Sequence, residues 1–521
     1  MARPGFLPIG LLWLAFLAAT LLGRPLLPID ETRYLSVAWE MWRDHSFLVP
    51  RLEGIPYSHK PPLLFWLFHM GWTVFGVDAW WPRLVNPLLL LLNLRLAAGL
   101  YRLLWPWNPE GGRRVVLLLL GCTFWSVSGT LVMFDMLLVA CSLLALTGLF
   151  RVLQRGESRG WWLFGLGTGL GFLAKGPVIL LPILGPALLA PAIGLLGAGS
   201  RKRWFGRLLL ALLLAVGIAL AWAIPAALRG GERFGREILW GQVSGRLVSS
   251  FAHGRPWWWY LPLLPALFFP WVFWPRIGKG LSRLRLSDPG VRIVGTWLLP
   301  AALGFFLVSG KQAHYLLPLF PPLALLAARG LAELPRGGAR DLGWLGGVLI
   351  LLGVAGAFLP VLGTRFGLPA WIHDGAPLWG AVPILGGLLV NAPVPGLDGI
   401  LSRLCLVSAC VALWIHFALV PVLAPVYDLG PVSRELGRVM ETGAPVAYRG
   451  HDNGEFLFLG RLPRSLTEIS DPEELRAWKR SHPDGWVLYH EAGRPGRRAA
   501  GAVFTQPYRE GALSLWKGTG G

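Results

Sequence analysis

The chain has 521 residues, of which 54% are hydrophobic and 15% are charged. A soluble protein carries roughly a quarter charged residues, so this composition excludes a soluble globular protein. The formal net charge is +20. The basic residues lie in short clusters between apolar runs rather than on one patch, which argues against a nucleic-acid partner and is typical of the loops of a membrane protein.

Apolar runs recur along most of the chain, each long enough to cross a hydrocarbon core of about 30 Å. We predict about thirteen crossings with the amino terminus inside, and we interpret the first run as a membrane helix rather than a signal peptide. The predicted crossings are 6–23, 81–104, 115–131, 137–153, 161–175, 177–198, 208–228, 260–275, 291–309, 315–331, 343–363, 377–392 and 401–424. The loops after the even-numbered crossings hold the arginine and lysine clusters, as expected of cytoplasmic loops.

The apolar segment 61–77 is left out of these crossings. It follows a Pro-Pro pair, and counting it as a crossing would move the basic cluster at 201–207 to the outside. We predict that it forms an amphipathic helix along the outer interface, anchored by Trp66 and Trp72. Residues 1–427 then form the membrane part, with large outer loops at 24–80 and 229–259.

The composition changes after residue 427, and residues 428–521 alternate polar and apolar positions as a small mixed α/β domain does. After an odd number of crossings this domain lies outside. Helices are predicted at 433–442 and 471–481, the second capped by Ser470 or Asp471. Strands are predicted at 445–448, 456–459 and 486–489.

Two carboxylates, Asp30 and Glu31, directly follow the first crossing at the membrane surface. A carboxylate there can act as a base or stabilise positive charge during sugar transfer. The alternative is structural, because an acidic pair at a helix start caps the helix and complements its dipole. Lys60 has a similar alternative as an interfacial lysine whose stem lies along apolar surface.

Further charged or polar residues are predicted at the same outer surface, in short turns and in the second large loop. They are Asp135, Lys175, His253, Arg255, Lys311, His314 and Tyr315. Charges embedded in a membrane are costly and tend to be functional. The cations Lys60, Arg255 and Lys311, with the Tyr315 hydroxyl, suit a phosphate at the level of the lipid headgroups.

The ordered set of motifs resembles a known family. DETRY (30–34), KPPL (60–63), FDM (134–136), FLAKGP (172–177), HGRPWWWYLP (253–262) and HYLLPLFPPLALL (314–326) are similar to the bacterial aminoarabinose transferases that modify lipid A. Those enzymes are relatives of the protein O-mannosyltransferases and have the GT-C fold. The resemblance covers about 30–327, with weaker likeness beyond.

The resemblance implies a GT-C membrane glycosyltransferase whose sugar donor is carried on undecaprenyl or a similar polyprenyl phosphate. It implies that Asp30 is the central carboxylate, supported by Asp135. It also implies that the donor phosphate is held by Lys60, Arg255 and Tyr315. We add Glu31 to the predicted catalytic carboxylates and Lys311 to the predicted phosphate-binding residues. It also implies a divalent metal site, of zinc or of manganese or magnesium, that includes His253. The family usually has Glu before Lys-Pro-Pro, whereas this chain has His59, so the predicted metal ligands are His59 and His253.

The resemblance places the enzyme in the bacterial inner membrane with its active site facing the periplasm. The predicted acceptor is a lipid A-like molecule or another cell-envelope glycan or lipid. A protein hydroxyl is the alternative acceptor for the same fold. A transporter or flippase of a lipid-linked anion is a third hypothesis, but it would place binding charges near the bilayer midplane between repeated halves.

Overall fold

The computed structural model describes residues 7–195, 201–241, 254–335, 342–366, 378–394, 396–492 and 501–518. The chain packs as two compact units, which are described separately. The first unit comprises Met1–Leu21 and Arg83–Ala418, and the second comprises Leu22–Pro82 and Leu419–Gly521.

Among the described residues of the first unit, the regular secondary structure is helical apart from an isolated bridge between Gly254 and Gly310. Its α-helices are α1 (Leu7–Leu22), α4 (Trp80–Leu104), α5 (Gly111–Leu120), α6 (Thr123–Ser128), α7 (Asp135–Arg155), α8 (Gly160–Lys175), α9 (Leu180–Leu189), α10 (Arg201–Gly230), α11 (Glu232–Arg236), α13 (Leu264–Leu267), α14 (Pro275–Ser282), α15 (Pro289–Leu307), α16 (Phe320–Ala332), α17 (Gly343–Phe366), α19 (Leu378–Asn391) and α20 (Gly396–Trp414). Short 3-10 or π turns are η1 (Gly176–Ile179), η2 (Glu237–Gly241), η3 (Trp257–Leu263), η4 (Trp271–Phe273), η5 (Ala313–Leu319) and η7 (Ile415–Leu419).

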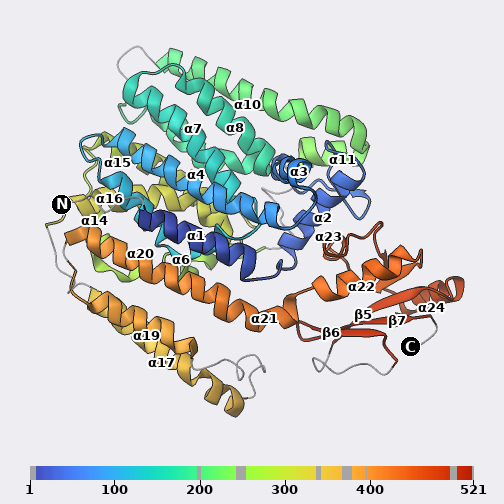
Figure 1. Ribbon diagram of the computed structural model, residues 1–521. Coiled ribbons are helices and arrows are strands. Elements are labelled where there is room, and N and C mark those ends of the chain that lie inside the picture. The colour runs from blue at the N-terminus through green and yellow to red at the C-terminus, as the bar shows by residue number, and fades with distance from the viewer. Residues whose placement is uncertain are drawn as a thin grey trace. The chain divides into compact units, whose positions relative to one another are not determined.

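Helices α7, α8 and α10 run side by side, with α8 in the middle (Figure 1). Small residues allow the close approach of α7 and α8. A Cβ added at Gly167 would lie 2.5 Å from the backbone nitrogen of Ala145, and one at Gly148 would lie 2.4 Å from the carbonyl oxygen of Gly160. This is the small-residue packing typical of membrane helices.

Eight helical stretches among the described residues are long and apolar enough to cross a membrane, fewer than the crossings predicted from the sequence. The predicted crossing 115–131 is divided at Gly121 into α5 and α6. The predicted crossing 260–275 consists of short turns, because its prolines interrupt the helical hydrogen bonds. The predicted crossing 177–198 begins as a continuation of α8 through η1, within the apolar stretch Gly160–Leu189.

The second unit combines the segment after α1 with the end of the chain. Its helices are α2 (Asp30–Arg43), α3 (Leu63–Phe75), α21 (Val420–Tyr427), α22 (Gly430–Glu441), α23 (Leu457–Gly460) and α24 (Pro472–Ser481). Its strands are β1 (Arg51–Leu52), β2 (Ile55–Pro56), β3 (Val446–Arg449), β4 (Thr467–Glu468), β5 (Trp486–Ala492), β6 (Phe504–Tyr508) and β7 (Gly511–Lys517). Helix α2 packs against α3, β1 and α23, so segments far apart in the sequence share one folded body.

A mixed sheet of five strands in the order β4-β3-β5-β7-β6 forms the centre of the carboxyl-terminal part. Strand β3 is parallel to β4 and β5, while β7 is antiparallel to β5 and β6. Helix α22 buries Leu436 with Leu488 and Leu513 of the sheet. Figure 1 shows this sheet with α22 and α24 beside it, which is the small α/β fold predicted from the sequence.

Most of the predicted local elements in this part are confirmed. Helices α22 and α24 lie where they were expected, and the Asp471 side chain caps α24 by accepting a hydrogen bond from the Glu473 nitrogen at 2.9 Å. The strand predicted at 456–459 is wrong, because these residues begin the short helix α23. Its apolar residues Leu457 and Phe458 are fully buried, and a short buried apolar run does not distinguish a strand from a helix.

Helix α3 covers the middle of the segment 61–77. At 1.5 Å per residue a helix of this length reaches about 20 Å, too short for a hydrocarbon core of about 30 Å. Helices α1 and α19, which were predicted to cross, are also shorter than a full crossing, so leaving the segment 61–77 out of the crossings stays a prediction.

Candidate functional site

The predicted site residues fall into both units of the structure. Those in the second unit are Asp30, Glu31, His59 and Lys60. Those in the first unit are Asp135, Arg255, Lys311 and Tyr315. His253, the predicted second metal ligand, lies outside the described residues.

Asp30 is the first residue of α2, and its side chain is 36% exposed. It forms an ion pair with Arg33 one turn along the same helix. The residue at the cap position is Ile29, which offers no side-chain acceptor, so the Asp30 carboxylate is held by a cation rather than by a capping contact. The carboxylate is therefore paired but not buried.

Glu31 differs from Asp30 in its burial. Its side chain is buried and pairs with the Arg24 guanidinium through two contacts, at 2.5 and 2.7 Å. The same carboxylate accepts a hydrogen bond from the Leu27 backbone nitrogen at 2.8 Å. These contacts fasten the segment before α2 to the first turn of the helix, so the geometry of Glu31 is that of a structural residue.

Lys60 follows the β1–β2 hairpin and lies over an aromatic ring of α2. Its Nζ is 5.7 Å from the ring centroid of Tyr34, and the guanidinium of Arg33 is also 5.7 Å from that centroid. A cation within about 6 Å of a ring face is attracted by the ring quadrupole. Tyr34 thus has two cations beside it close to the start of α2, of which Arg33 is paired with Asp30.

His59 is exposed, and its ring centroid lies 5.1 Å from that of Tyr57. Among the described residues no group of three His, Cys, Asp or Glu side chains has the geometry of a metal site. Because His253 is outside those residues, the His59 and His253 pair stays a prediction.

Asp135 is the first residue of α7, and Lys175 is the last residue of α8. The lysine Nζ lies 2.5 Å from Asp135 Oδ1, with the two side chains only 8% and 3% exposed. The Lys175 Nζ also lies 4.6 Å from the ring centroid of Tyr315. His314 Nε2 is 3.8 Å from the other carboxylate oxygen of Asp135. Four residues from three segments therefore form one compact polar cluster.

Arg255 and Lys311 belong to two chain segments joined by backbone contacts. Gly254 and Gly310 form an isolated bridge, and the Arg255 nitrogen donates to the Ser309 oxygen at 3.0 Å. The Lys311 ammonium is buried and donates to the carbonyl oxygens of Arg255, at 3.2 Å, and of Val308.

The guanidinium of Arg255 behaves differently. It is exposed and lies 4.6 Å from the ring centroid of Trp259. Arg255 can therefore meet a phosphate from outside, whereas the ammonium of Lys311 binds backbone carbonyls and holds the two segments together.

Two asparagines that the sequence prediction missed position the start of α7. Asn86 Nδ2 donates to the carbonyl oxygen of Met133 at 3.1 Å, and Asn93 Nδ2 donates to that of Met136 at 3.0 Å. Both asparagines lie in the apolar helix α4 and are buried. A polar side chain in an apolar run was the signal that could have found them.

A group of carboxylates surrounds the turn of the β1–β2 hairpin. The Gly454 nitrogen donates to Glu53 Oε1 at 2.9 Å. Burial, followed by the charges of Asp452 and Glu468, raises the pKa of Glu53 from an ordinary 4.5 to about 9. Burial also raises the pKa of Asp452 to about 6 and that of Glu455 to about 7.

These raised pKa values couple the stability of the second unit to pH. Between pH 4.5 and about 9 the folded state holds a proton on Glu53 that the unfolded chain releases. The unfolded state then binds fewer protons, so the free energy of unfolding falls as pH rises through this window.

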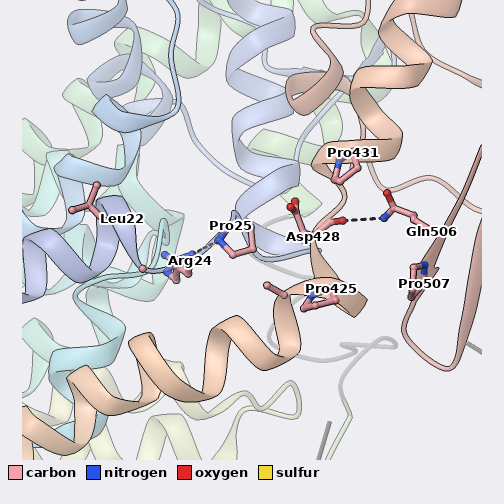
Figure 2. Close-up of a pocket in the computed structure, with 10 residues that line it drawn as sticks. Leu22, Arg24, Pro25, Pro425, Asp428, Pro431, Gln506 and Pro507 are labelled. Atoms are coloured by element: carbon pink, nitrogen blue, oxygen red, sulfur yellow. Dashed lines mark hydrogen bonds between the residues drawn. The ribbon is translucent and has the colours of Figure 1, made fainter. Parts of the chain in front are cut away.

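A cavity of about 730 Å³ opens in the second unit (Figure 2). Its lining consists of Leu22, Gly23, Arg24, Pro25, Ala424, Pro425, Asp428, Pro431, Gln506 and Pro507. The Gln506 side chain donates to the Asp428 carbonyl oxygen and accepts from the Val432 nitrogen, each at 2.9 Å. Arg24, the partner of Glu31, lines the cavity, while Asp30 and Lys60 are not among the described lining residues.

The family described as dolichyl-phosphate-mannose-protein mannosyltransferase matches residues 59–228. The undecaprenyl phosphate-alpha-4-amino-4-deoxy-L-arabinose arabinosyl transferase 2 of Pseudomonas fluorescens is 31% identical over 66% of this chain and 63% of its own length. The undecaprenyl phosphate-alpha-4-amino-4-deoxy-L-arabinose arabinosyl transferase of Pseudomonas savastanoi pv. phaseolicola is 30% identical over 80% of this chain and 79% of its own length. The match to the first of these relatives thus spans less than two thirds of its length.

The crystal structure of ArnT from Cupriavidus metallidurans bound to undecaprenyl phosphate has the same fold, with a TM-score of 0.75. The two chains are 18% identical, and the similarity covers 99% of this chain and 98% of the other. This likeness confirms the predicted GT-C fold, a helical membrane body with a small carboxyl-terminal α/β part. Because the savastanoi relative matches at 30% identity over about four fifths of both chains, the protein belongs to the family of undecaprenyl phosphate-alpha-4-amino-4-deoxy-L-arabinose arabinosyl transferases.

Proposed function

We propose that this protein is an inner-membrane glycosyltransferase that moves a sugar from an undecaprenyl or similar polyprenyl phosphate to a lipid A-like or other cell-envelope acceptor on the periplasmic face. The observation that carries the proposal is the cluster of Asp135, Lys175 and Tyr315 at the ends of apolar helices. A buried, paired charge at such a position tends to be functional in a membrane protein. The family membership supplies the donor class.

The reaction exchanges one bond at the anomeric carbon of the sugar. The bond from that carbon to the phosphate oxygen breaks, and a bond to the acceptor oxygen forms. The leaving polyprenyl phosphate gains negative charge, which Lys60 and Arg255 would offset through charge-assisted hydrogen bonds. Asp30, half-exposed at the start of α2, is proposed to take the proton of an acceptor hydroxyl or to stabilise positive charge on the sugar.

The test is transfer in proteoliposomes that contain the purified protein and no other enzyme. The donors are a synthetic polyprenyl phosphate carrying 4-amino-4-deoxy-L-arabinose and the matching nucleotide sugar. Transfer from the lipid donor alone is the expected result. Activity with the nucleotide sugar alone would overturn the proposal.

The acceptor is decided in the same vesicles by offering lipid A and a serine- and threonine-rich peptide together. The match to protein mannosyltransferases over 59–228 is the observation that favours a protein acceptor as the second candidate. We expect label on lipid A, and label on the peptide alone would reverse the order of the two candidates.

Metal use is proposed only through His59 and His253. Neutral imidazoles are ordinary ligands of zinc, so bound metal should be lost as pH falls below about 6. Metal analysis of the parent and of His59→Ala checks this proposal. A parent protein without bound zinc, manganese or magnesium would remove the metal from the mechanism.

A further inference from the structure

His314 occupies a distinctive place in the polar cluster of the first unit. Its side chain is 21% exposed, whereas the Asp135 side chain beside it is 3% exposed. Asp135 offers one oxygen to Lys175 at 2.5 Å and has its other oxygen 3.8 Å from His314 Nε2. Of these three side chains, the imidazole has the largest exposed fraction.

We infer that His314 donates a proton to the leaving phosphate of the lipid donor, and that Asp135 is the residue that positions it. The inference rests on the proposed function, because it assumes that a polyprenyl phosphate is the leaving group. His314 directly precedes Tyr315 in η5, and the two rings meet edge to face with centroids 4.8 Å apart. The imidazole therefore lies beside the hydroxyl-bearing ring proposed to contact the same phosphate.

The proton balance of the reaction makes room for such a donor. In the donor, the phosphate is a diester with one negative charge. When the bond to the sugar breaks, the phosphate becomes a monoester with a second negative charge. A proton from the imidazolium of His314 to the departing oxygen returns the phosphate to one negative charge. The acceptor proton leaves separately, to a carboxylate or to water, and solvent reprotonates the imidazole.

The chemistry of the neighbours selects His314 for this step. An imidazole has an ordinary pKa of about 6.5, close to the second pKa of about 6 of a phosphate monoester, so the proton transfer is nearly balanced. Lysine and tyrosine, with ordinary values of about 10, are poorly matched to such an acceptor near neutral pH. The Lys175 ammonium is moreover committed to Asp135 at 2.5 Å.

The titratable groups of the region around the imidazole come from several elements. Asp135 belongs to α7, Lys175 to α8 and Tyr315 to η5 itself. Tyr260 of η3 donates its hydroxyl hydrogen to the carbonyl oxygen of Gln312 at 3.2 Å, two residues before His314. Lys175 pairs with one oxygen of the Asp135 carboxylate, and the other oxygen lies 3.8 Å from Nε2 of the imidazole.

The test compares the parent with His314→Gln from pH 5.5 to 8.5, using the lipid donor in proteoliposomes. General acid catalysis typically contributes at least about a hundred-fold. We therefore expect kcat to fall about a hundred-fold near neutral pH, with KM for the donor little changed. In the parent, kcat should fall as pH rises, because the imidazole loses the proton that it donates. This fall should be absent from the variant. Gln312→Ala is the matched control and should keep the parent profile, since Gln312 contributes its carbonyl to this region.

A second measurement covers a variant that folds poorly. The parent and His314→Asn are compared on the lipid donor and on its phosphorothioate analogue, whose leaving group is the stronger acid and needs a proton less. The deficit of the variant should shrink on the analogue, whereas a folding defect lowers both rates equally. A parent that transfers while His314→Gln shows the same rate and pH profile overturns this inference alone. A parent that fails to transfer from either lipid donor overturns the proposed function first.

Discussion

Replacing Lys175 by methionine should destabilise the first unit as well as stop transfer. The Lys175 ammonium lies 2.5 Å from Asp135 Oδ1. At that separation and an effective dielectric constant of about 20, the Coulomb attraction is about 7 kcal/mol. Desolvation of the two ions offsets most of this attraction, so the intact pair contributes little net stability. Removing one partner is different, because it leaves a carboxylate that is 3% exposed with no lysine.

The expected loss for Lys175→Met is about 3 to 5 kcal/mol in the free energy of unfolding. The double variant Asp135→Leu with Lys175→Met removes both charges, and we expect it to recover most of that loss. Both proteins should be inactive, so stability and activity separate in the double variant. Non-additivity of this kind measures the coupling between the two side chains.

The assay is unfolding by sodium dodecyl sulfate in mixed micelles, with the melting temperature in detergent as a second measure. Glu157→Gln is the control, since its pair with Arg155 has a separation of 3.4 Å and side chains 41% and 59% exposed. Loss of an exposed pair should change stability by less than about 1 kcal/mol. Two results would contradict a buried ion pair between Asp135 and Lys175. One is a free energy of unfolding for Lys175→Met equal to that of the control. The other is a loss of stability in the double variant equal to the sum of the losses in the two single variants.

Asp30→Asn should abolish transfer and leave the melting temperature unchanged. Glu31→Gln should lower the free energy of unfolding by about 1 to 3 kcal/mol, because it weakens buried charge-assisted contacts. Equal melting temperatures for the two variants would refute the assignment of Asp30 to chemistry and of Glu31 to structure. We expect a fall in kcat/KM for the lipid donor of about ten- to a hundred-fold in Lys60→Ala and in Arg255→Ala, because each variant loses phosphate contacts worth about 1.5 to 3 kcal/mol. An unchanged kcat/KM would show that the replaced residue does not bind the phosphate. Glu53→Gln should reduce the fall in the free energy of unfolding between pH 6 and 9, because one proton held only by the folded state lowers that energy by up to about 1.4 kcal/mol per pH unit as pH rises. Parallel plots of melting temperature against pH for parent and variant would contradict the raised pKa.

Sequence reasoning predicted the helical membrane fold and the local elements with strong periodicity or caps. It found α22 and α24 because amphipathic spacing and the Asp471 cap are local signals. It did not find β6 and β7, nor the order of the sheet, because pairing between distant strands leaves no local mark. The break at Gly121 was also missed. A Cβ there would lie 2.7 Å from the Trp271 ring and 2.9 Å from the Cys405 backbone, contacts that depend on the folded structure.

The site was predictable in residue type but not in pairing. Asp135 and Lys175 were chosen as isolated charges in apolar runs, and the structure brings them together across 40 residues. The partner of Glu31 was missed, although Arg24 lies only 7 residues before it. An arginine after a membrane helix is expected to lie at the lipid surface, so the sequence did not indicate that Arg24 pairs with a buried carboxylate.

The two aspartates of the predicted site differ in ways that assign them different work. Asp30 is 36% exposed and pairs with Arg33 on the same helix, so its side chain is accessible to water. Asp135 is 3% exposed and bound to Lys175, so exchanging a proton would leave a buried ammonium without its counter-charge. A buried carboxylate bound to an ammonium is proposed to act by positioning the imidazole beside it. Asn at position 30 should therefore remove a chemical step, whereas Asn at position 135 should disturb the arrangement around Lys175 and His314 before any step begins.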